Sequence, residues 1–260
     1  MPHVTDPADP RLADYRGLRD PAARVAYERA HGVFVVEGAL AIERLLASSY
    51  DVRSVLVTPA MRDRLGLDDG EAYVASREVI AAVAGFDVHR GALAVAARAP
   101  LPAAADLVGG ATTVLLLERL NDHENVGVLF RVARALGADA VLLDPETCDP
   151  LYRRAVRVSL GHVLHVPFTR VDSTREGLDL LRANGFTTYA LTPAGDVSVA
   201  DVPRAARCAL LLGAEGPGLR PETMQAADYR VGIPMRADVD SLNVATAAAI
   251  ALHRLADPAG

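Results

Sequence analysis

Apolar and polar residues alternate along this chain with two spacings, one typical of buried strands and one typical of amphipathic helices. In the first hundred residues, strands are predicted at 33–36, 52–58, 72–74 and 92–97. Helices are predicted at 20–31, at 76–84 and after Gly38 through Leu46. This part of the chain is therefore predicted to form a small α/β unit.

The second half of the chain repeats the alternation more regularly. Strands are predicted at 113–117, 140–143, 163–167, 187–191, 209–212 and 229–233. Helices are predicted at about 126–136, 151–160, 173–183 and 221–226, and in an alanine-rich run that ends at Leu255. This order is typical of a mostly parallel sheet covered by helices on both faces, where ligands bind at the carboxyl ends of the strands.

Proline and glycine suggest how the chain is divided. Three prolines in residues 1–10 predict a flexible tail, and the Pro/Ala/Gly-rich stretch 100–111 predicts a linker. The predicted domains are then 11–99 and 112–260.

Composition excludes several classes of protein. The 260 residues are 51% hydrophobic with a net charge of −6, enough for a substantial core. Cys148 and Cys208 are the only cysteines and form no Cys-x-x-Cys, which argues against a disulfide scaffold and a zinc cluster, so no metal is predicted. No apolar run approaches the roughly 20 residues of a membrane span, and no signal core is found. We expect a cytoplasmic protein without a membrane partner.

The charge pattern leaves a nucleic-acid partner open. An acidic balance disfavours nucleic acid, but the chain has no lysine, and arginine holds phosphate with two parallel hydrogen bonds. The missing lysine is equally explained by genomic base composition. Arg153, Arg154 and Arg157 on one predicted helix are a candidate RNA-facing patch, and a solvated helix face is the alternative for Arg153 and Arg154.

The first candidate stretch is 121–137, which follows a predicted strand end. Asn125 is expected to cap the helix that opens near Val126. Arg131 lies nearly two turns on and is expected at the edge of the core, where an arginine holds an anion such as an RNA phosphate. A surface ion pair is the alternative for Arg131.

The second and third stretches also follow predicted strands. In 210–219, three glycines in six residues indicate tight turns or close approach to a ligand, but the spacing fits neither a dinucleotide loop nor a phosphate loop. In 233–255, Asp240 or Ser241 is expected to cap the last helix, with Asn243 one turn inside it. An ordinary C-terminal core helix with a serine cap is the alternative.

The three stretches, in this order, resemble the SpoU (TrmH) branch of the SPOUT RNA methyltransferases. The resemblance rests on Asn-x-x-x-x-x-Arg at 125–131, Gly-x-Glu-Gly-x-Gly-Leu at 213–219 and Ile-Pro-Met with Ser-Leu-Asn-Val at 233–244, and it covers about 112–255. Arg157, Ser159 and Gly161 match the Arg-x-Ser-x-Gly of that family. Residues 15–98 resemble the ribosomal-protein-like RNA-binding domain that often precedes it.

The resemblance implies a SPOUT domain with a parallel sheet and a deep trefoil knot, a homodimer, and S-adenosylmethionine as the cofactor. The residues implied to bind the cofactor are Gly213, Ile233, Leu242, Thr192, Gly195 and Met235. The implied catalytic set is Arg131, Asn125, Glu215, Ser241 and Asn243.

The implied reaction is methyl transfer to a ribose 2′-hydroxyl of structured RNA. Arginine is a poor general base in proteins, so we expect Arg131 to clamp a phosphate and stabilise the developing alkoxide. Ser241 and Asn243 would orient the hydroxyl, and Glu215 would hold Asn125 or Arg131. Large-subunit rRNA is the expected substrate. The alternatives are tRNA, a non-catalytic RNA-binding protein of the same fold, and a nucleotide-dependent α/β enzyme, which the missing phosphate loop disfavours.

Overall fold

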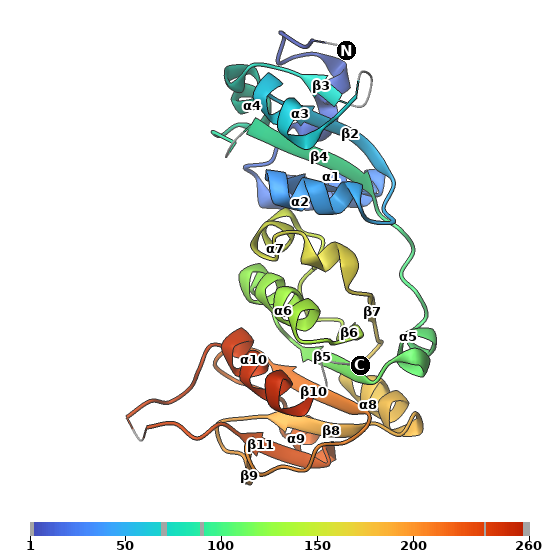
Figure 1. Ribbon diagram of the computed structural model, residues 1–260, viewed down its shortest axis with the longest axis vertical. Coiled ribbons are helices and arrows are strands. Elements are labelled where there is room, and N and C mark those ends of the chain that lie inside the picture. The colour runs from blue at the N-terminus through green and yellow to red at the C-terminus, as the bar shows by residue number, and fades with distance from the viewer. Residues whose placement is uncertain (1–2, 69–71, 89–90, 237, 257–260) are drawn as a thin grey trace. The chain divides into compact units, whose positions relative to one another are not determined.

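The computed structural model describes residues 3–68, 72–88, 91–236 and 238–256. The chain divides into two compact units (Figure 1). Unit 1 comprises Met1–Pro100 and Leu151–Leu164, and unit 2 comprises Leu101–Pro150 and His165–Gly260. The first two residues of the predicted tail, and the last four of the predicted second domain, lie outside the described residues.

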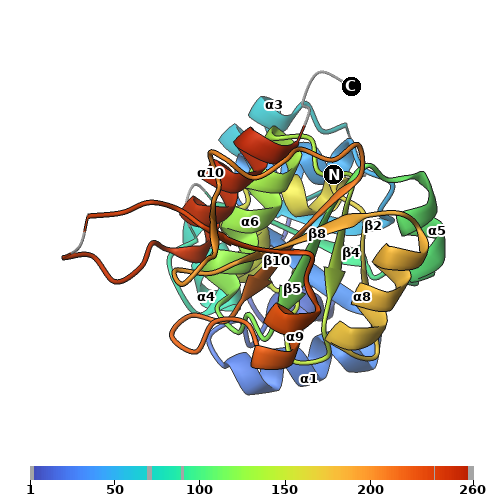
Figure 2. The same ribbon diagram turned by 90° about the horizontal axis from the view of Figure 1, so that it is seen from below.

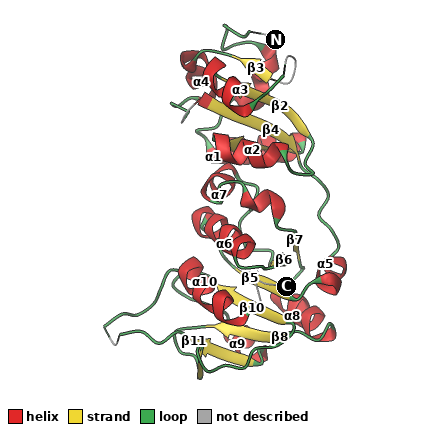
Figure 3. Cartoon of the chain, in the orientation of Figure 1, coloured by secondary structure: helices red, strands yellow, loops and turns green. Residues whose placement is uncertain are grey.

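Unit 1 is built on a mixed four-stranded sheet in the order β1-β4-β2-β3, and Figure 3 shows β4 beside β2. Its strands are β1 (Val33–Glu37), β2 (Val52–Val57), β3 (Ala72–Val74) and β4 (Ala92–Ala97). β4 runs antiparallel to β1 and β2, and β3 runs parallel to β2. Its helices are η1 (Pro10–Tyr15), α1 (Pro21–His31), α2 (Ala39–Leu46), α3 (Pro59–Leu65), α4 (Arg77–Ala84) and α7 (Arg153–Val158).

The end signals of α1 explain why the helix predicted at 20–31 is confirmed. The Asp20 carboxylate accepts a hydrogen bond from the Ala23 amide at 3.0 Å, and Pro21 occupies the first helical position, where no amide hydrogen is needed. Gly32 then ends the helix in the left-handed conformation.

The start of the chain differs from the predicted flexible tail. Val4 is 2% exposed and its amide donates to the Val74 carbonyl at 2.9 Å. Val4 joins Leu12 and Tyr15 in the core of unit 1. The predicted flexible tail is therefore contradicted at Val4, which packs in the core, whereas residues 5–8 and Pro10 are exposed.

The segment Leu151–Leu164 belongs to unit 1, although its place in the sequence put it in the predicted second domain. Glu37 at the end of β1 is 3% exposed, and Arg153 Nη1 and Arg157 Nη1 donate to its carboxylate at 2.7 and 3.2 Å. A Cβ on Gly161, whose φ is +83°, would lie 2.9 Å from the Ala41 Cα. Two predictions are thereby corrected. Residues 151–164 do not belong to the predicted second domain, and Arg153 and Arg157 pair with a buried carboxylate of their own chain instead of forming an RNA-facing or solvated helix face.

Unit 2 contains a seven-stranded sheet in the order β7-β6-β5-β10-β8-β11-β9. Every pair of neighbouring strands is parallel, which confirms the predicted sheet type. The strands are β5 (Thr113–Glu118), β6 (Ala140–Leu143), β7 (Phe168–Arg170), β8 (Thr187–Leu191), β9 (Val197–Ser198), β10 (Cys208–Gly213) and β11 (Tyr229–Gly232). β5 is buried along its whole length, as expected for a central strand covered on both faces.

The helices of unit 2 fall into two groups (Figure 2). α6 (His123–Ala135) and α10 (Val244–Leu255) pack against each other, and α10 also contacts β10 and β8. α8 (Thr174–Ala183) contacts α5 (Ala104–Gly110), α9 (Pro221–Ala226) and the sheet. Leu116, Leu142, Leu178 and Leu211 lie together in the core on the α8 side.

Several predicted elements of unit 2 need correction. The strand predicted at 163–167 is replaced by a 3-10 helix, η3 (His162–His165), and the strand begins only at Phe168. The predicted linker 100–111 contains α5. No helix within the described part of the chain is long and apolar enough to cross a membrane.

The site is positioned by the break in strand order between β5 and β10. The chain runs from β5 through β6 to β7 on one side, whereas β10, β8 and β11 lie on the other side. In open parallel sheets, the crevice for a ligand forms where the strand order reverses, at the carboxyl ends. In this sheet Glu118 and Gly213 end the two strands and are register partners.

Candidate cofactor and active site

The segments that leave the carboxyl ends of β8, β10 and β11 meet in one cavity of about 320 Å³. Five of the predicted cofactor residues line it, namely Thr192, Gly213, Ile233, Met235 and Leu242, as do three of the predicted catalytic residues, Glu215, Ser241 and Asn243. Leu191, Pro193 and Leu212, which the sequence analysis did not select, line it too. Their signal was available, because each lies at the end of a predicted strand.

Gly213 is required by a close approach of the backbone. A Cβ at this position would lie 2.2 Å from the Leu219 amide nitrogen and 2.3 Å from the Gly218 carbonyl carbon. The Gly218 amide donates to the Ala214 carbonyl at 2.9 Å, so 214–218 forms a closed loop. The glycine spacing therefore makes a compact loop whose backbone forms one wall of the cavity.

Three polar side chains from three distant stretches join at this wall. Asn125 Nδ2 donates to Glu215 Oε1 at 2.5 Å, and Asn243 Nδ2 donates to Asn125 Oδ1 at 2.7 Å. Asn125 is 7% exposed, so its amide is fixed in a mostly dry environment. These hydrogen bonds bring the three predicted stretches together and orient all three side chains.

The caps of the two helices differ from those predicted. Asp122 caps α6, where its carboxylate accepts from the Glu124 amide at 2.8 Å, and Asn125 lies inside the helix. Asn243, rather than Asp240 or Ser241, caps α10, because its Oδ1 accepts from the amides of Ala245 and Thr246. Asn243 therefore both starts α10 and contacts Asn125.

Arg131 is exposed, which corrects the expectation that it lies at the core edge. Six residues are one and two-thirds helical turns, so Arg131 projects from a different side of α6 from Asn125. Within the described ranges it is not among the residues lining the cavity. Arg131 is thus free to meet a partner outside its own chain's cavity.

Gly195, predicted to bind the cofactor, lies against the backbone of β11. Its Cβ would be 2.1 Å from the Gly232 amide nitrogen, and Gly195 is not among the described residues that line the cavity. Glycine is therefore needed there for the packing of two backbone segments.

The two cysteines are poor nucleophiles. Burial raises the pKa of Cys148 to about 12 and also raises the pKa of Cys208. Within the described residues, no group of three or more His, Cys, Asp or Glu side chains is placed to hold a metal ion.

The cavity fits S-adenosylmethionine in its chemistry. Leu191, Leu212, Ile233 and Leu242 offer apolar walls suited to an adenine ring. Thr192, Ser241 and exposed backbone groups of the Gly213 loop offer hydrogen bonds to its polar groups. Gly213 lets the chain at Gly218 and Leu219 pack against it, which keeps the loop closed beside the cavity.

Comparison with known proteins identifies the family. The model of the SpoU rRNA Methylase family matches residues 112–253, more than half of the chain. An uncharacterized tRNA/rRNA methyltransferase of Mycobacterium tuberculosis is 44% identical over 96% of this chain and 90% of its own length. The 23S rRNA (guanosine(2553)-2′-O)-methyltransferase RlmP of Bacillus subtilis is 27% identical over 98% of this chain and 99% of its own.

A solved structure agrees with these matches. The AdoMet-bound rRNA methyltransferase of Sinorhizobium meliloti superposes with a TM-score of 0.81 at 25% identity, over 97% of this chain and 96% of that one. The resemblance inferred from the three motifs is thereby confirmed, and the cofactor is S-adenosylmethionine. By its sequence and its fold, the chain belongs to the SpoU rRNA methylase family of RNA methyltransferases.

Proposed function

We propose that this protein transfers the methyl group of S-adenosylmethionine to a ribose 2′-hydroxyl of large-subunit rRNA. The observation that carries the proposal is the hydrogen-bonded cluster of Asn125, Glu215 and Asn243 at the cofactor cavity. RlmP, a 23S rRNA 2′-O-methyltransferase, is similar to this chain over nearly its whole length. The first unit would be the RNA-binding domain that the sequence resemblance implies.

The cluster is suited to positioning a hydroxyl group. Asn243 Oδ1 is occupied by the cap of α10 and Glu215 Oε1 receives two amide donors, so these groups are fixed before the substrate arrives. Ser241 lies exposed on the same cavity wall and can orient the ribose oxygen toward the methyl group. Proton removal is then left to an RNA phosphate oxygen or to water, because none of the positive side chains is a suitable base.

Arg131 is proposed to clamp an RNA phosphate and to stabilise the developing alkoxide. Because Arg131 does not line the cavity of its own chain among the described residues, we propose that it acts at the cavity of a second copy in a homodimer. The deep trefoil knot implied by the family resemblance is part of the same proposal.

Methylation of purified RNA tests the reaction. Ribosomal RNA and tRNA from a strain lacking the gene are incubated with the protein and S-adenosylmethionine, and modified nucleosides are mapped by mass spectrometry. A single 2′-O-methyl nucleotide in large-subunit rRNA is expected. Base methylation alone, modification of tRNA only, or cofactor binding without transfer would each contradict the proposal.

Two arginines on α6 test the role of Arg131. Arg131→Ala should reduce transfer by about a hundredfold or more and leave cofactor binding nearly unchanged. Arg134→Ala, which removes another exposed arginine of the same helix, should retain activity. Mixing Arg131→Ala with Asn125→Ala subunits should restore part of the activity if the site is shared between copies. Equal loss of binding and transfer in Arg131→Ala would refute the role.

A further inference from the structure

The loop that carries Glu215 is held by two consecutive residues at the carboxyl end of β5, by Glu118 at its exit and by Arg119 at Gly218. We propose that Glu118 and Arg119 are positioning residues, which hold the loop 214–220 in the shape of the cofactor cavity and so set the affinity for S-adenosylmethionine without touching it. This inference rests on the proposed function in taking the cavity as the cofactor site.

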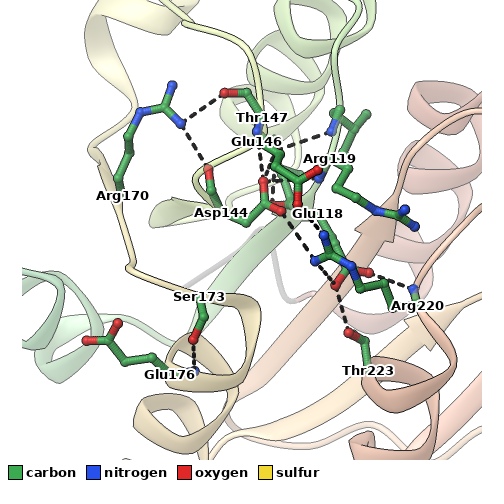
Figure 4. A network of polar contacts seen from close by, with 12 residues as sticks. Glu118, Arg119, Asp144, Glu146, Thr147, Arg170, Ser173, Glu176, Arg220 and Thr223 are labelled. Carbon is green, nitrogen blue, oxygen red and sulfur yellow. Dashed lines mark hydrogen bonds and ion pairs between the residues drawn. The ribbon is translucent and has the colours of Figure 1, made fainter.

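Glu118 fixes the exit of the loop. Its carboxylate is 0% exposed and accepts from the Arg220 amide at 2.7 Å, from Arg220 Nη1 at 3.3 Å and from Thr223 Oγ1 at 2.8 Å (Figure 4). Glu118 is also the register partner of Gly213, where the loop begins. One buried side chain therefore lies beside the entry of the loop and bonds to its exit.

Arg119 holds the middle of the same loop. Its Nη2 donates to the Gly218 carbonyl at 3.1 Å, and its amide donates to Asp144 Oδ1 at 3.0 Å. Its φ is +57°, a conformation that non-glycine residues rarely adopt, and its Nε is buried with no hydrogen-bond partner among the described residues. The positive φ and the unpaired buried Nε both cost free energy, and such costs at one residue are typical of functional positions.

Two further acidic residues, Asp144 and Glu146, contact Arg119 and Arg220. Asp144, which follows β6 and is 0% exposed, also accepts from the amide and hydroxyl of Thr147 at 2.8 and 2.7 Å. Arg220 Nη1 lies 3.9 Å from Asp144 Oδ2, and Arg220 Nη2 pairs with Glu146. The ends of β5 and β6 therefore act together on Arg220, so the exit of the loop has a single favoured position.

Neither positioning residue is among the described residues that line the cavity, whereas Gly213, Glu215 and Gly218 are. A change at Arg119 can therefore reach the cofactor only through the loop. Movement of the loop would displace Glu215 from Asn125 as well, so the same device also influences the orientation of the polar cluster.

The test removes the Arg119 side chain and restores its charge. Arg119→Ala should weaken binding of S-adenosylmethionine, measured by calorimetry without RNA, about tenfold, because a charged donor to a partly buried carbonyl is lost. Arg119→Lys should restore binding to within about threefold. Arg175→Ala, which removes an exposed arginine paired with Asp179, is the matched control and should bind as the wild type does.

Hydrogen exchange of the cofactor-free proteins separates positioning from a general loss of stability. In Arg119→Ala, the backbone amides of the loop 214–220 should exchange faster than in the wild type, and those of the strands of unit 2 should exchange at the wild-type rate. Wild-type affinity in Arg119→Ala, or weaker binding with faster exchange throughout unit 2, would overturn the inference. Failure of the proposed function gives a different result, since wild-type protein would then bind the cofactor and methylate no ribose.

Discussion

Both units join a distant segment of the chain to the end of a strand with the same two devices, a buried glutamate that faces arginine and a glycine in close backbone contact. In unit 1, Glu37 pairs with Arg153 and Arg157, and Gly161 lies against Ala41. In unit 2, Glu118 pairs with Arg220, and Gly213 lies against Gly218 and Leu219.

The devices differ in what they hold. Glu37 secures the helix α7, and neither Arg153 nor Arg157 is among the described residues that line the cofactor cavity. Glu118 secures a loop whose other residues form a wall of that cavity. The same interaction therefore contributes to stability in unit 1 and, in our proposal, to cofactor affinity in unit 2. Substitutions in the two devices should separate these effects.

The largest effect is expected from Gly213→Ala. The added Cβ meets backbone atoms of Gly218 and Leu219 that cannot move without opening the loop. We expect a loss of about 3 kcal/mol in unfolding free energy and at least about hundredfold weaker binding of S-adenosylmethionine. Urea unfolding and calorimetry measure the two. Gly185→Ala, at a residue outside the described lining of the cavity where a Cβ meets open space and only a positive φ opposes it, should show a much smaller change in both.

Glu118→Gln should act on both stability and binding. The amide that replaces one carboxylate oxygen faces donors from Arg220 or Thr223, so we expect a loss of about 2–3 kcal/mol in unfolding free energy. Cofactor binding should weaken about tenfold. Glu222→Gln, at an exposed carboxylate nearby in the chain, is the control. A Glu118→Gln protein that loses stability but binds normally would remove the distinction between the two devices.

Glu37→Gln should reduce stability alone. Arg153 and Arg157 lose a buried carboxylate, but Arg157 is 48% exposed and remains hydrated, so we expect a loss of about 2 kcal/mol. Hydrogen exchange should quicken in β1 and α7, while the affinity for S-adenosylmethionine stays that of the wild type. A weaker affinity would mean that the unit 1 device also controls the site.

The smallest effect is expected from Arg157→Ala. The Arg157 side chain is about half exposed, and solvent screening limits such a pair to about 0.5 kcal/mol. Arg153→Ala should cost more, because Arg153 is 20% exposed and its guanidinium lies 4.6 Å from the centre of the Phe86 ring. Thermal unfolding of the two variants measures the difference, and the reverse order would show that exposure does not govern these pairs.

Much of the fold could be predicted from local patterns. The four-residue apolar run 114–117 of β5 and the cap, proline and glycine signals of α1 determine those elements within the segment itself. The strand predicted at 163–167 was wrong because its apolar residues pack in a 3-10 turn and the following stretch, a choice made by tertiary contacts. The predicted flexible tail was wrong at Val4 for a similar reason, since Val4 is held by β3.

Within the site, the sequence identified residues better than it identified their roles. Glycine spacing and the motif order selected Gly213, Glu215 and Asn243, which the structure places at one cavity. The same reasoning gave Asn125 and Asn243 the wrong positions relative to their helix starts, because Asp122 competes as a cap and the α10 helix begins later. Glu118 and Arg119 were not selected, because a charged residue after an apolar run has no distinctive spacing.

The sequence by itself determined the type of sheet, five of its seven strands and the family, because these depend on periodicity and on short motifs read within one segment. Only the tertiary structure decided that Leu151–Leu164 packs in unit 1 and that Glu118 meets Arg220. Each of these depends on which distant side chain offers a partner for a charge, and a pairing between residues a hundred positions apart leaves no periodic trace along the chain.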